Sequence, residues 1–254
     1  MEKIILLAGK GVSTNIVYNY LSKFYEIEKV IFEEPPSRLQ LIRKRIKRFG
    51  FYKVAGQLAF QTVVAKWLTI TSRKRKVEII KEYHLDTSPP PQSKTLPVNS
   101  INDRQVIDYL IKTQPQLAIV NGTRIISRKV LDATGCTFIN MHAGITPKYR
   151  NVHGAYWALV NNDRENCGVT VHLVDPGIDT GKIIYQSGIN PMKEDNFVTY
   201  PLLQVAEGVN LLGNAIKDFF NNQLEFQSGS KESHLWYHPT IFQYLYYRLF
   251  RGIK

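Results

Sequence analysis

Two polar residues that could do chemistry, Asn140 and His142, stand one residue apart at the end of the apolar run "CTFINMH", before a loop that contains Pro147. Active residues gather at the carboxyl ends of parallel strands, because the loops converge there. Taken alone, the pair favours a simpler interpretation, in which Asn140 turns the chain and His142 is an ordinary surface histidine.

A second stretch, the loop "VDPGIDTG", changes that balance. Its Asp179 lies between glycines that let the backbone pass close to a ligand, and it follows the apolar run "GVTVHLV". A carboxylate beside an imidazole raises the imidazole pKa and fixes its tautomer, while a carboxamide can donate to a developing oxyanion. Asn140, His142 and Asp179 together therefore suit acyl transfer to an amine.

Other reactive residue types do not indicate a different chemistry. The six histidines are scattered and form no zinc-site spacing with Cys136 and Cys167, so no metal is expected. Cys136 lies within an apolar run and no "GxSxG" motif occurs, so a serine or cysteine nucleophile is poorly supported.

Short apolar runs separated by helical patterns would position these residues. The start of a parallel βαβ unit is predicted at the amino end. It consists of the strand "KIILLAG", a glycine turn, a helix from Ile16 and the strand "EKVIFEEPP". The proline-rich "TSPPPQSKTLPVNS" is expected to be a connection, and "TRIISRKVLDAT" a short helix. Further strands are expected at 117–122, 136–142, 168–175 and 181–189, the last two as an antiparallel hairpin, with a long amphipathic helix over 200–222.

The charge of the chain is local. With 254 residues, of which 44% are apolar and 21% charged, the composition is that of one globular α/β domain. The window Arg38–Lys81 holds thirteen Lys or Arg and one acid, Glu78. The charge of this window is therefore +12, the same as the net charge of the whole chain. The remainder is neutral, so a nucleic-acid binder that uses its whole surface is not expected.

The basic window is expected to be helical, with an apolar face made of Val54, Leu58, Val64, Ala65 and Leu68. Polar residues interrupt the run 49–70, which makes it a poor transmembrane candidate. Two cysteines cannot build a disulfide framework, and the start "MEKIILLAGKG" lacks the features of a secretory signal, so a cytoplasmic location is expected.

The sequence resembles the folate-dependent formyltransferases, whose signature is Asn-x-His plus an aspartate in a "D-x-G-x-D-x-G" loop. The resemblance lies in "FINMHAGITPKYR" followed by "GVTVHLVDPGIDTGKIIYQ". The resemblance covers residues 1–222. It implies a Rossmann-like formyltransferase fold, α/β, with a mostly parallel twisted sheet and helices on both faces. Residues 38–91 would be a basic helical insertion, and 223–254 an aromatic, basic tail.

The same resemblance implies the ligands and the site. It places catalysis on Asn140, His142 and Asp179, with 10-formyltetrahydrofolate as the formyl donor and no metal. The residues that match the family's folate pocket are Arg124, Ile126, Val174, Asp175 and Gly177. Those that match an acceptor and phosphate site are Gly11, Ser13, Asn15 and Glu207.

The acceptor amine is less well specified. "PKYRNVHGAYWAL" resembles formyltransferases of amino-sugar pathways, which favours an amino sugar, either nucleotide-linked or a polysaccharide precursor. The alternative is phosphoribosylglycinamide formyltransferase, although Ala143, "GITP" and Gly208 depart from that enzyme's pattern. Methionyl-tRNA is disfavoured, because only about thirty residues follow the long helix and a tRNA-binding domain of ordinary size needs more. A further alternative is a non-catalytic module that binds membrane or nucleic acid.

The basic segment suggests three partners. An apolar helical face flanked by cations suits a weak contact between 38–81 and an anionic membrane, which would place the protein at the inner membrane face. The same face could instead pack on the domain or on a second subunit in a homodimer, and a phosphate-bearing substrate could use some of the cations. Nucleic acid is not expected.

Overall fold

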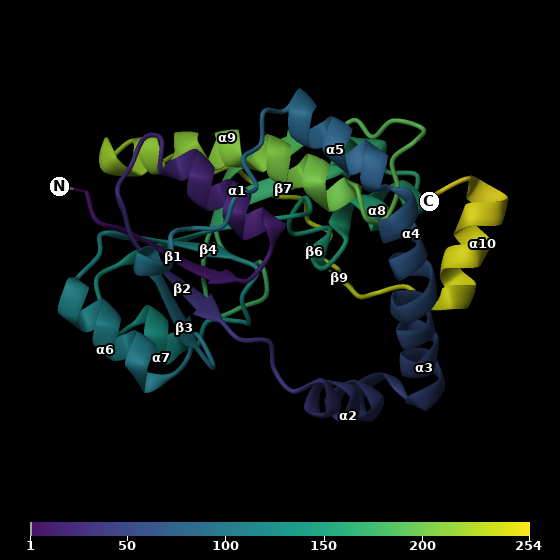
Figure 1. Ribbon diagram of the computed structural model, residues 1–254, viewed down its shortest axis with the longest axis horizontal. Coiled ribbons are helices and arrows are strands. Elements are labelled where there is room, and N and C mark those ends of the chain that lie inside the picture. The colour runs from purple at the N-terminus through teal and green to yellow at the C-terminus, as the bar shows by residue number, and fades with distance from the viewer. Residues whose placement is uncertain (1) are drawn as a thin grey trace.

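The apolar runs form a seven-stranded sheet with the order β3-β2-β1-β4-β5-β7-β8 in the computed structural model, which describes residues 2–254 (Figure 1). The strands are β1 (Ile4–Gly9), β2 (Ile27–Glu33), β3 (Thr95–Val98), β4 (Leu117–Asn121), β5 (Thr137–His142), β7 (Gly168–Leu173) and β8 (Ile183–Gly188). The first five are parallel, and β7 and β8 are added in antiparallel fashion. The mostly parallel sheet and the predicted hairpin are both confirmed.

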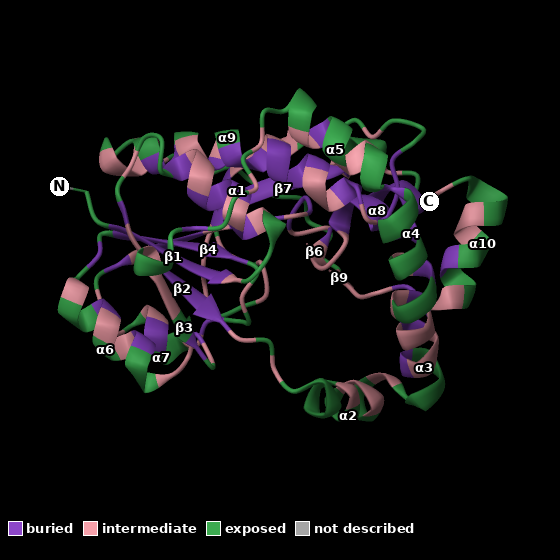
Figure 2. Ribbon diagram, viewed as in Figure 1, coloured by how far each residue is buried: buried purple, intermediate pink, exposed green. Residues whose placement is uncertain are grey.

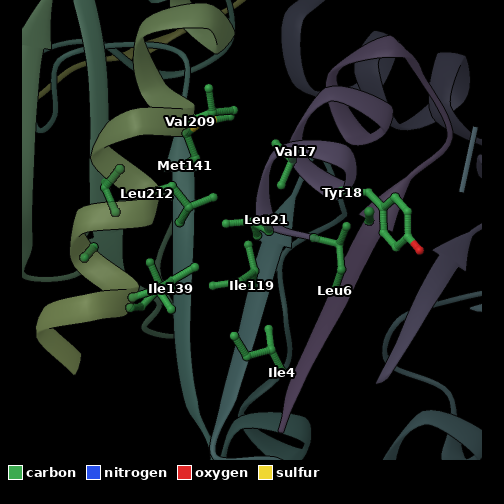
Figure 3. Packing of buried hydrophobic residues seen from close by; sticks show 14 of the residues in the cluster. Ile4, Leu6, Val17, Tyr18, Leu21, Ile119, Ile139, Met141, Val209 and Leu212 are labelled. Atoms are coloured by element: carbon green, nitrogen blue, oxygen red, sulfur yellow. The ribbon is translucent and has the colours of Figure 1, made fainter. Parts of the chain in front are cut away.

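Helices cover both faces of the sheet, as expected. On one face, α1 (Val12–Leu21) and α9 (Tyr200–Phe220) lie over the strands, and α6 (Arg104–Thr113) and α7 (Arg128–Leu131) lie on the other (Figure 1). Figure 3 shows alternate strand residues packing against Val17, Val209 and Leu212 on the first face. Because both faces are buried, the strands carry nearly continuous apolar runs, which is why they could be located in the sequence.

Two local expectations were wrong. The proline-rich connection contains β3, an edge strand, and a sheet edge is where proline is tolerated because one side of the strand needs no partner. The helix expected from Thr123 is confined to Arg128–Leu131, and the residues before it form a loop at the end of β4.

The basic segment is helical from Arg38 to Glu82, apart from short breaks at Gly50 and Ser72, and the rest of the expected insertion, residues 83–91, is not helical. We call residues 38–82 the helical arm. It comprises α2 (Arg38–Phe49), α3 (Phe51–Ala59), a π-helical segment (Phe60–Val64), α4 (Ala65–Thr71) and α5 (Arg73–Glu82). Val54, Phe60, Val64 and Leu68 are buried, and the last three belong to a core cluster that also holds Tyr156 of α8 (Gly154–Val160). Figure 2 shows this buried stripe and the exposed outer surface. The predicted apolar face is therefore largely correct, and it serves packing within the chain.

Residues 223–254 fold back onto the loop after β5. The strand β9 (Leu235–Trp236) pairs in parallel with β6 (Arg150–Asn151), and α10 (Ile241–Arg251) packs along α3 (Figure 1). Thr240 begins α10 with a capping box, in which Thr240 and Gln243 each accept the other's backbone N–H. Within the described chain, no helix has both the length and the apolar character needed to cross a membrane.

Candidate active site

A cavity of about 1050 Å³ lies at the carboxyl ends of β4 and β5. The three predicted catalytic residues, Asn140, His142 and Asp179, all line it. Asn140 and His142 are the last alternate residues of β5, so their side chains project from the same side of the strand end. Asp179 arrives from the loop between β7 and β8, with a left-handed backbone conformation at φ 50°.

His142 is buried between two acceptor oxygens. Its Nδ1 lies 3.4 Å from Oδ2 of Asp179, and its Nε2 lies 2.9 Å from the carbonyl oxygen of Tyr149. A neutral imidazole has one N–H and can donate to only one of these oxygens, whereas an imidazolium can donate to both. The surroundings of His142 are therefore arranged to stabilise the ring once it gains a proton.

Burial nevertheless lowers the pKa of His142 below its ordinary value, although the Asp179 carboxylate and the Tyr149 carbonyl act in the opposite direction. The ring is accordingly neutral at pH 7 before substrate binds. Burial would raise the pKa of Asp179, but attraction to His142 and His172 in their protonated forms and the hydrogen bond from the Asn151 N–H outweigh it and lower that pKa to about 2. The site thus starts with a carboxylate beside a neutral imidazole.

His172 is the main residue that sequence reasoning missed. It stands directly opposite Asn140 across the β5–β7 pairing. Its Nδ1 lies 2.7 Å from the carbonyl oxygen of Leu173, which places the proton there, so Nε2 accepts from Nδ2 of Asn140 at 3.1 Å. Nδ2 of Asn140 also donates to Oδ1 of Asp179 at 3.4 Å. His172 stood in the run "GVTVHLV", but only the strand register reveals its partner.

Asn151 connects the site to the tail. Its backbone N–H donates to Oδ2 of Asp179 at 2.9 Å, and its Nδ2 donates to the carbonyl oxygen of Trp236 at 2.6 Å. Asn151 has a φ of 80°, a left-handed conformation that asparagine tolerates better than most residues. One residue therefore holds both the carboxylate and β9.

The residues predicted to hold the donor all line the cavity: Arg124, Ile126, Val174, Asp175 and Gly177. The Arg124 side chain does not point freely into it, because its Nε lies 3.0 Å from Oε1 of Glu33 and its Nη2 donates to the carbonyl of Asn99. Arg124 thus fixes the loop after β4, and this loop presents backbone groups and the buried Ile126 to the cavity.

The residues predicted to hold the acceptor are divided. Ser13 lines the cavity and bonds to the Asn121 side chain, but Gly11, Asn15 and Glu207 are outside its lining. Nδ2 of Asn15 donates to the carbonyl of Thr87, and Oε1 of Glu207 accepts from the Ser187 hydroxyl at 2.7 Å.

The helical arm supplies two lining residues that the sequence did not indicate, Lys76 and Ile80 of α5. Lys76 is half-buried, and burial lowers its pKa. Among the ion pairs of residues 2–254, none involves Lys76. Lys76 is thus a cation on the cavity wall without an acidic partner in the part of the chain that the structure describes.

A family model described as formyl transferase matches residues 53–202, more than half of the chain. The chain belongs to the formyl transferase family. A methionyl-tRNA formyltransferase of Finegoldia magna is 32% identical over 124 residues, which are 47% of this chain and 39% of that protein. The chain therefore spans less than half the length of this curated relative.

Solved formyl transferase structures share the fold. A glycinamide ribonucleotide transformylase of Symbiobacterium toebii aligns with a TM-score of 0.58 at 18% identity, covering 90% of this chain and 92% of that one. An N-formyltransferase of Helicobacter canadensis, described in complex with folinic acid and dTDP-3-aminofucose, aligns with a TM-score of 0.53 at 19% identity, covering 93% of this chain and 71% of that one.

The cavity of this formyl transferase suits a reduced folate. We call the part of the cavity around the residues predicted to hold the donor the donor wall, and its apolar members are Val120, Ile126 and Val174. In residues 2–254 neither the N–H nor the C=O of Ile126 has a hydrogen-bond partner. A pterin is flat and carries amide-like donors and acceptors along one edge, so an apolar slot with free backbone groups fits it. No group of three or more possible metal ligands occurs in the described part of the chain.

Proposed function

We propose that this protein transfers a formyl group from 10-formyltetrahydrofolate to a primary amine, most specifically that of an amino sugar. The observation that carries the proposal is His142, held between a carboxylate and a carbonyl in a cavity that also contains Asn140. A buried neutral histidine that can be stabilised as a cation suits a reaction in which an amine must lose a proton.

The donor supplies a formyl carbon bonded to a nitrogen that can leave. As the amine attacks that carbon, Asn140 donates an N–H to the formyl oxygen, turning away from its long 3.4 Å contact with Asp179. Because both ring nitrogens of His142 face protein oxygens, the proton of the amine passes through the Asp179 carboxylate to Nδ1 of His142, and the imidazolium that forms is stabilised by Asp179 and the Tyr149 carbonyl. The same proton then passes to the leaving nitrogen, so a C–N bond forms, a C–N bond breaks and His142 returns to its neutral state.

An amino sugar is the acceptor that the observations favour. Sugar N-formyltransferases are among the structural neighbours, including one described with a dTDP-linked amino sugar. The "KYR" segment leads into α8, where Tyr156 and Trp157 are buried as core residues. Glycinamide ribonucleotide is the second candidate, supported by the Symbiobacterium enzyme, but Glu207 lies outside the cavity lining and points to Ser187.

A competition between acceptors tests the proposal. Purified protein with saturating 10-formyltetrahydrofolate is given a dTDP-linked amino sugar, glycinamide ribonucleotide or methionyl-tRNA, and the formylated product is measured by mass. We expect the sugar to be formylated at least tenfold faster than the other two. A reversed preference would support the purine enzyme or the tRNA enzyme, and no turnover with any amine would support a non-catalytic binding module.

We place the reaction in the cytoplasm. The chain has two cysteines, Cys136 and Cys167, which are free and buried, and it therefore lacks the disulfide framework that is typical of small secreted domains. The homodimer expected from the sequence stays a prediction, which sedimentation velocity would check.

A further inference from the structure

Exposed apolar side chains are concentrated on one region of the surface. Of the twenty large apolar residues that are exposed among residues 2–254, thirteen lie on the helical arm or on α10, although these segments make up less than a quarter of the chain. They are Leu39, Leu41, Phe51, Tyr52, Val63, Trp67, Ile70, Val77, Phe242, Leu245, Tyr246, Leu249 and Phe250. Exposed patches of this kind mark interaction sites.

These residues form stripes distinct from the packed face of the arm. In the π-helical segment and α4, Val63, Trp67 and Ile70 follow helical spacing beside the buried Phe60, Val64 and Leu68. In α10, Phe242, Tyr246 and Leu249 follow the same spacing, and the buried Tyr244 lies on the other side of the helix. The apolar face used for folding is thus satisfied within the chain, and the outer stripes are additional.

The two stripes meet at Trp67. Arg248 of α10 lies over the Trp67 ring, 5.7 Å from its centroid, and α10 packs along α3 and the π-helical segment. Figure 1 shows α10 beside α3 and α4 at one end of the molecule. The outer stripes of the arm and of α10 therefore form one surface, which we call the outer patch.

The segments that carry the outer patch are also rich in cations. The arm and α10 together carry fifteen Lys or Arg and two acids, Glu78 and Glu82. α2 contributes six of the cations and has no buried residue, and no ion pair of the described chain involves any of these six. Their partners are neutral: Arg45 donates to Gln57, and Arg48 lies over the Phe49 and Tyr237 rings.

We propose that the outer patch and α2 dock the protein on an anionic lipid surface. Aromatic and aliphatic side chains flanked by Lys and Arg bury apolar area at the level of the lipid headgroups, while the cations bind anionic lipid. A second copy of this chain would present the same excess of cations and be repelled. RNA would use the aromatic rings and the cations, but it offers nothing to the aliphatic Val63, Ile70 and Leu249.

Co-sedimentation with vesicles tests the docking. The full chain is mixed with phosphatidylcholine vesicles, with or without phosphatidylglycerol, at low and high salt. We expect binding only to the anionic vesicles and a marked loss of binding at high salt. Binding does not require turnover, so this test stands even if no formyl transfer is found.

Two sets of substitutions separate charge from apolar insertion. The first variant replaces Arg43, Lys44, Lys47 and Arg48 by Gln, and vesicle binding should weaken by roughly fivefold for each cation removed. The second variant replaces Phe242, Leu249 and Phe250 by Ser, and vesicle binding at low salt should weaken at least tenfold. The matched controls are Lys23, Lys112, Lys129 and Lys217 to Gln, and Phe24, Ile111 and Phe226 to Ser, which remove exposed residues elsewhere.

Three results would overturn the proposal. The first is equal binding to neutral and anionic vesicles, or equal losses in the controls. The second is tighter binding to a short RNA than to the vesicles, with the α2 variant losing the RNA contact. The third is a stable dimer that the Phe242, Leu249 and Phe250 substitutions convert to monomer. Circular dichroism of each variant confirms that its fold is retained before binding is compared.

Discussion

At the residue scale, the proposed mechanism depends on His142, because this ring can exist in two states with different hydrogen bonding. The neutral ring donates to either Asp179 or the Tyr149 carbonyl and leaves the other acceptor unpaired, whereas the protonated ring donates to both. The energetic cost of burying the cation is thus offset at the moment when the amine releases its proton. Asn151 and His172 are positioning residues. The N–H of Asn151 holds the Asp179 carboxylate, and His172 holds the side-chain amide of Asn140.

Replacing His142 by Asn should lower kcat by about 10³-fold, because the proton acceptor is lost while the side chain stays polar. Donor affinity should be retained, since the segments that line the donor wall do not include position 142. Steady-state kinetics and a fluorescence titration with folinic acid measure the two quantities. His84→Asn is the control, because His84 is exposed and outside the cavity. Unchanged kcat in His142→Asn would remove this residue from the mechanism.

The pH dependence of kcat/KM should have an acid limb set by His142. The neutral ring is the active form, and burial lowers its pKa below the ordinary value of 6.5, so activity should be full at pH 7 and fall only below pH 6.5. Asp179 is already ionised there, since its pKa is about 2. Asp179→Asn removes the charge that opposes the lowering, so the limb should move to lower pH while the plateau drops. A limb above pH 7 would contradict this assignment.

At the scale of elements, β9 supports the loop between β5 and α8, which carries Tyr149 and Asn151. Trp236 donates from Nε1 to the carbonyl of Lys148, and its ring stacks on Tyr149 and Trp157. β9 therefore shapes the same loop whose Tyr149 carbonyl faces His142 and whose Asn151 N–H holds Asp179.

Trp236→Ala should lower kcat at least tenfold and destabilise the protein by about 2 kcal/mol, less than for a fully buried tryptophan because Trp236 is half-buried. Kinetics at 15 °C and urea unfolding measure the two effects. Phe226→Ala, also in the tail but exposed, should change neither quantity much. If kcat of Trp236→Ala is unaffected below the unfolding transition, the tail contributes stability alone.

α5 contributes Lys76 to the cavity, and its cation has no acidic partner in the described chain. If the acceptor is phosphorylated, Lys76→Ala should raise the acceptor KM about tenfold, which corresponds to one charge-assisted hydrogen bond. The KM of the donor should stay the same. Lys74→Ala, on the same helix but exposed, is the matched control. Equal increases for both substrates would indicate a general disturbance of α5.

At the scale of the whole molecule, the helical arm is part of the fold. Phe60 is fully buried and packs on Phe197 and Tyr244, with ring centroids 4.8 Å and 5.0 Å away. The arm thereby joins α10 and the region before α9 into one core. An insertion that merely projected into solvent would have no such contacts.

Phe60→Ala should therefore reduce the free energy of unfolding by about 3 to 5 kcal/mol, the usual cost of truncating a buried aromatic. Phe51→Ala, nine residues earlier and largely exposed, should change it by less than about 0.5 kcal/mol. Urea unfolding followed by circular dichroism measures both. Similar values for the two variants would show that the arm is not packed on the domain.

Local patterns in the sequence predicted much of this architecture. Six of the seven strands of the sheet, the hairpin, the long helix and the grouping of Asn140, His142 and Asp179 at one cavity all follow from apolar runs and short motifs. The roles of His172 and Asn151 could not be predicted, because each depends on strand register or on contacts with residues far along the chain.

The residues predicted to bind the acceptor also show what a sequence motif cannot predict. Asn15 and Glu207 were assigned by their position in a motif, but the structure turns their side chains toward Thr87 and Ser187. Lys76 had no motif at all, and it came to the cavity wall only because α5 lies against α9.

The contact between Asn151 and Trp236 also has a consequence for the order of biosynthesis. A ribosome makes the chain from the amino end, so the strands of the main sheet and the aspartate loop emerge before β9. A nascent chain can therefore fold its sheet while Asn151 still lacks the carbonyl of Trp236. If the proposed mechanism holds, the site would be completed only late in translation, once the carbonyl of Trp236 can accept from Asn151.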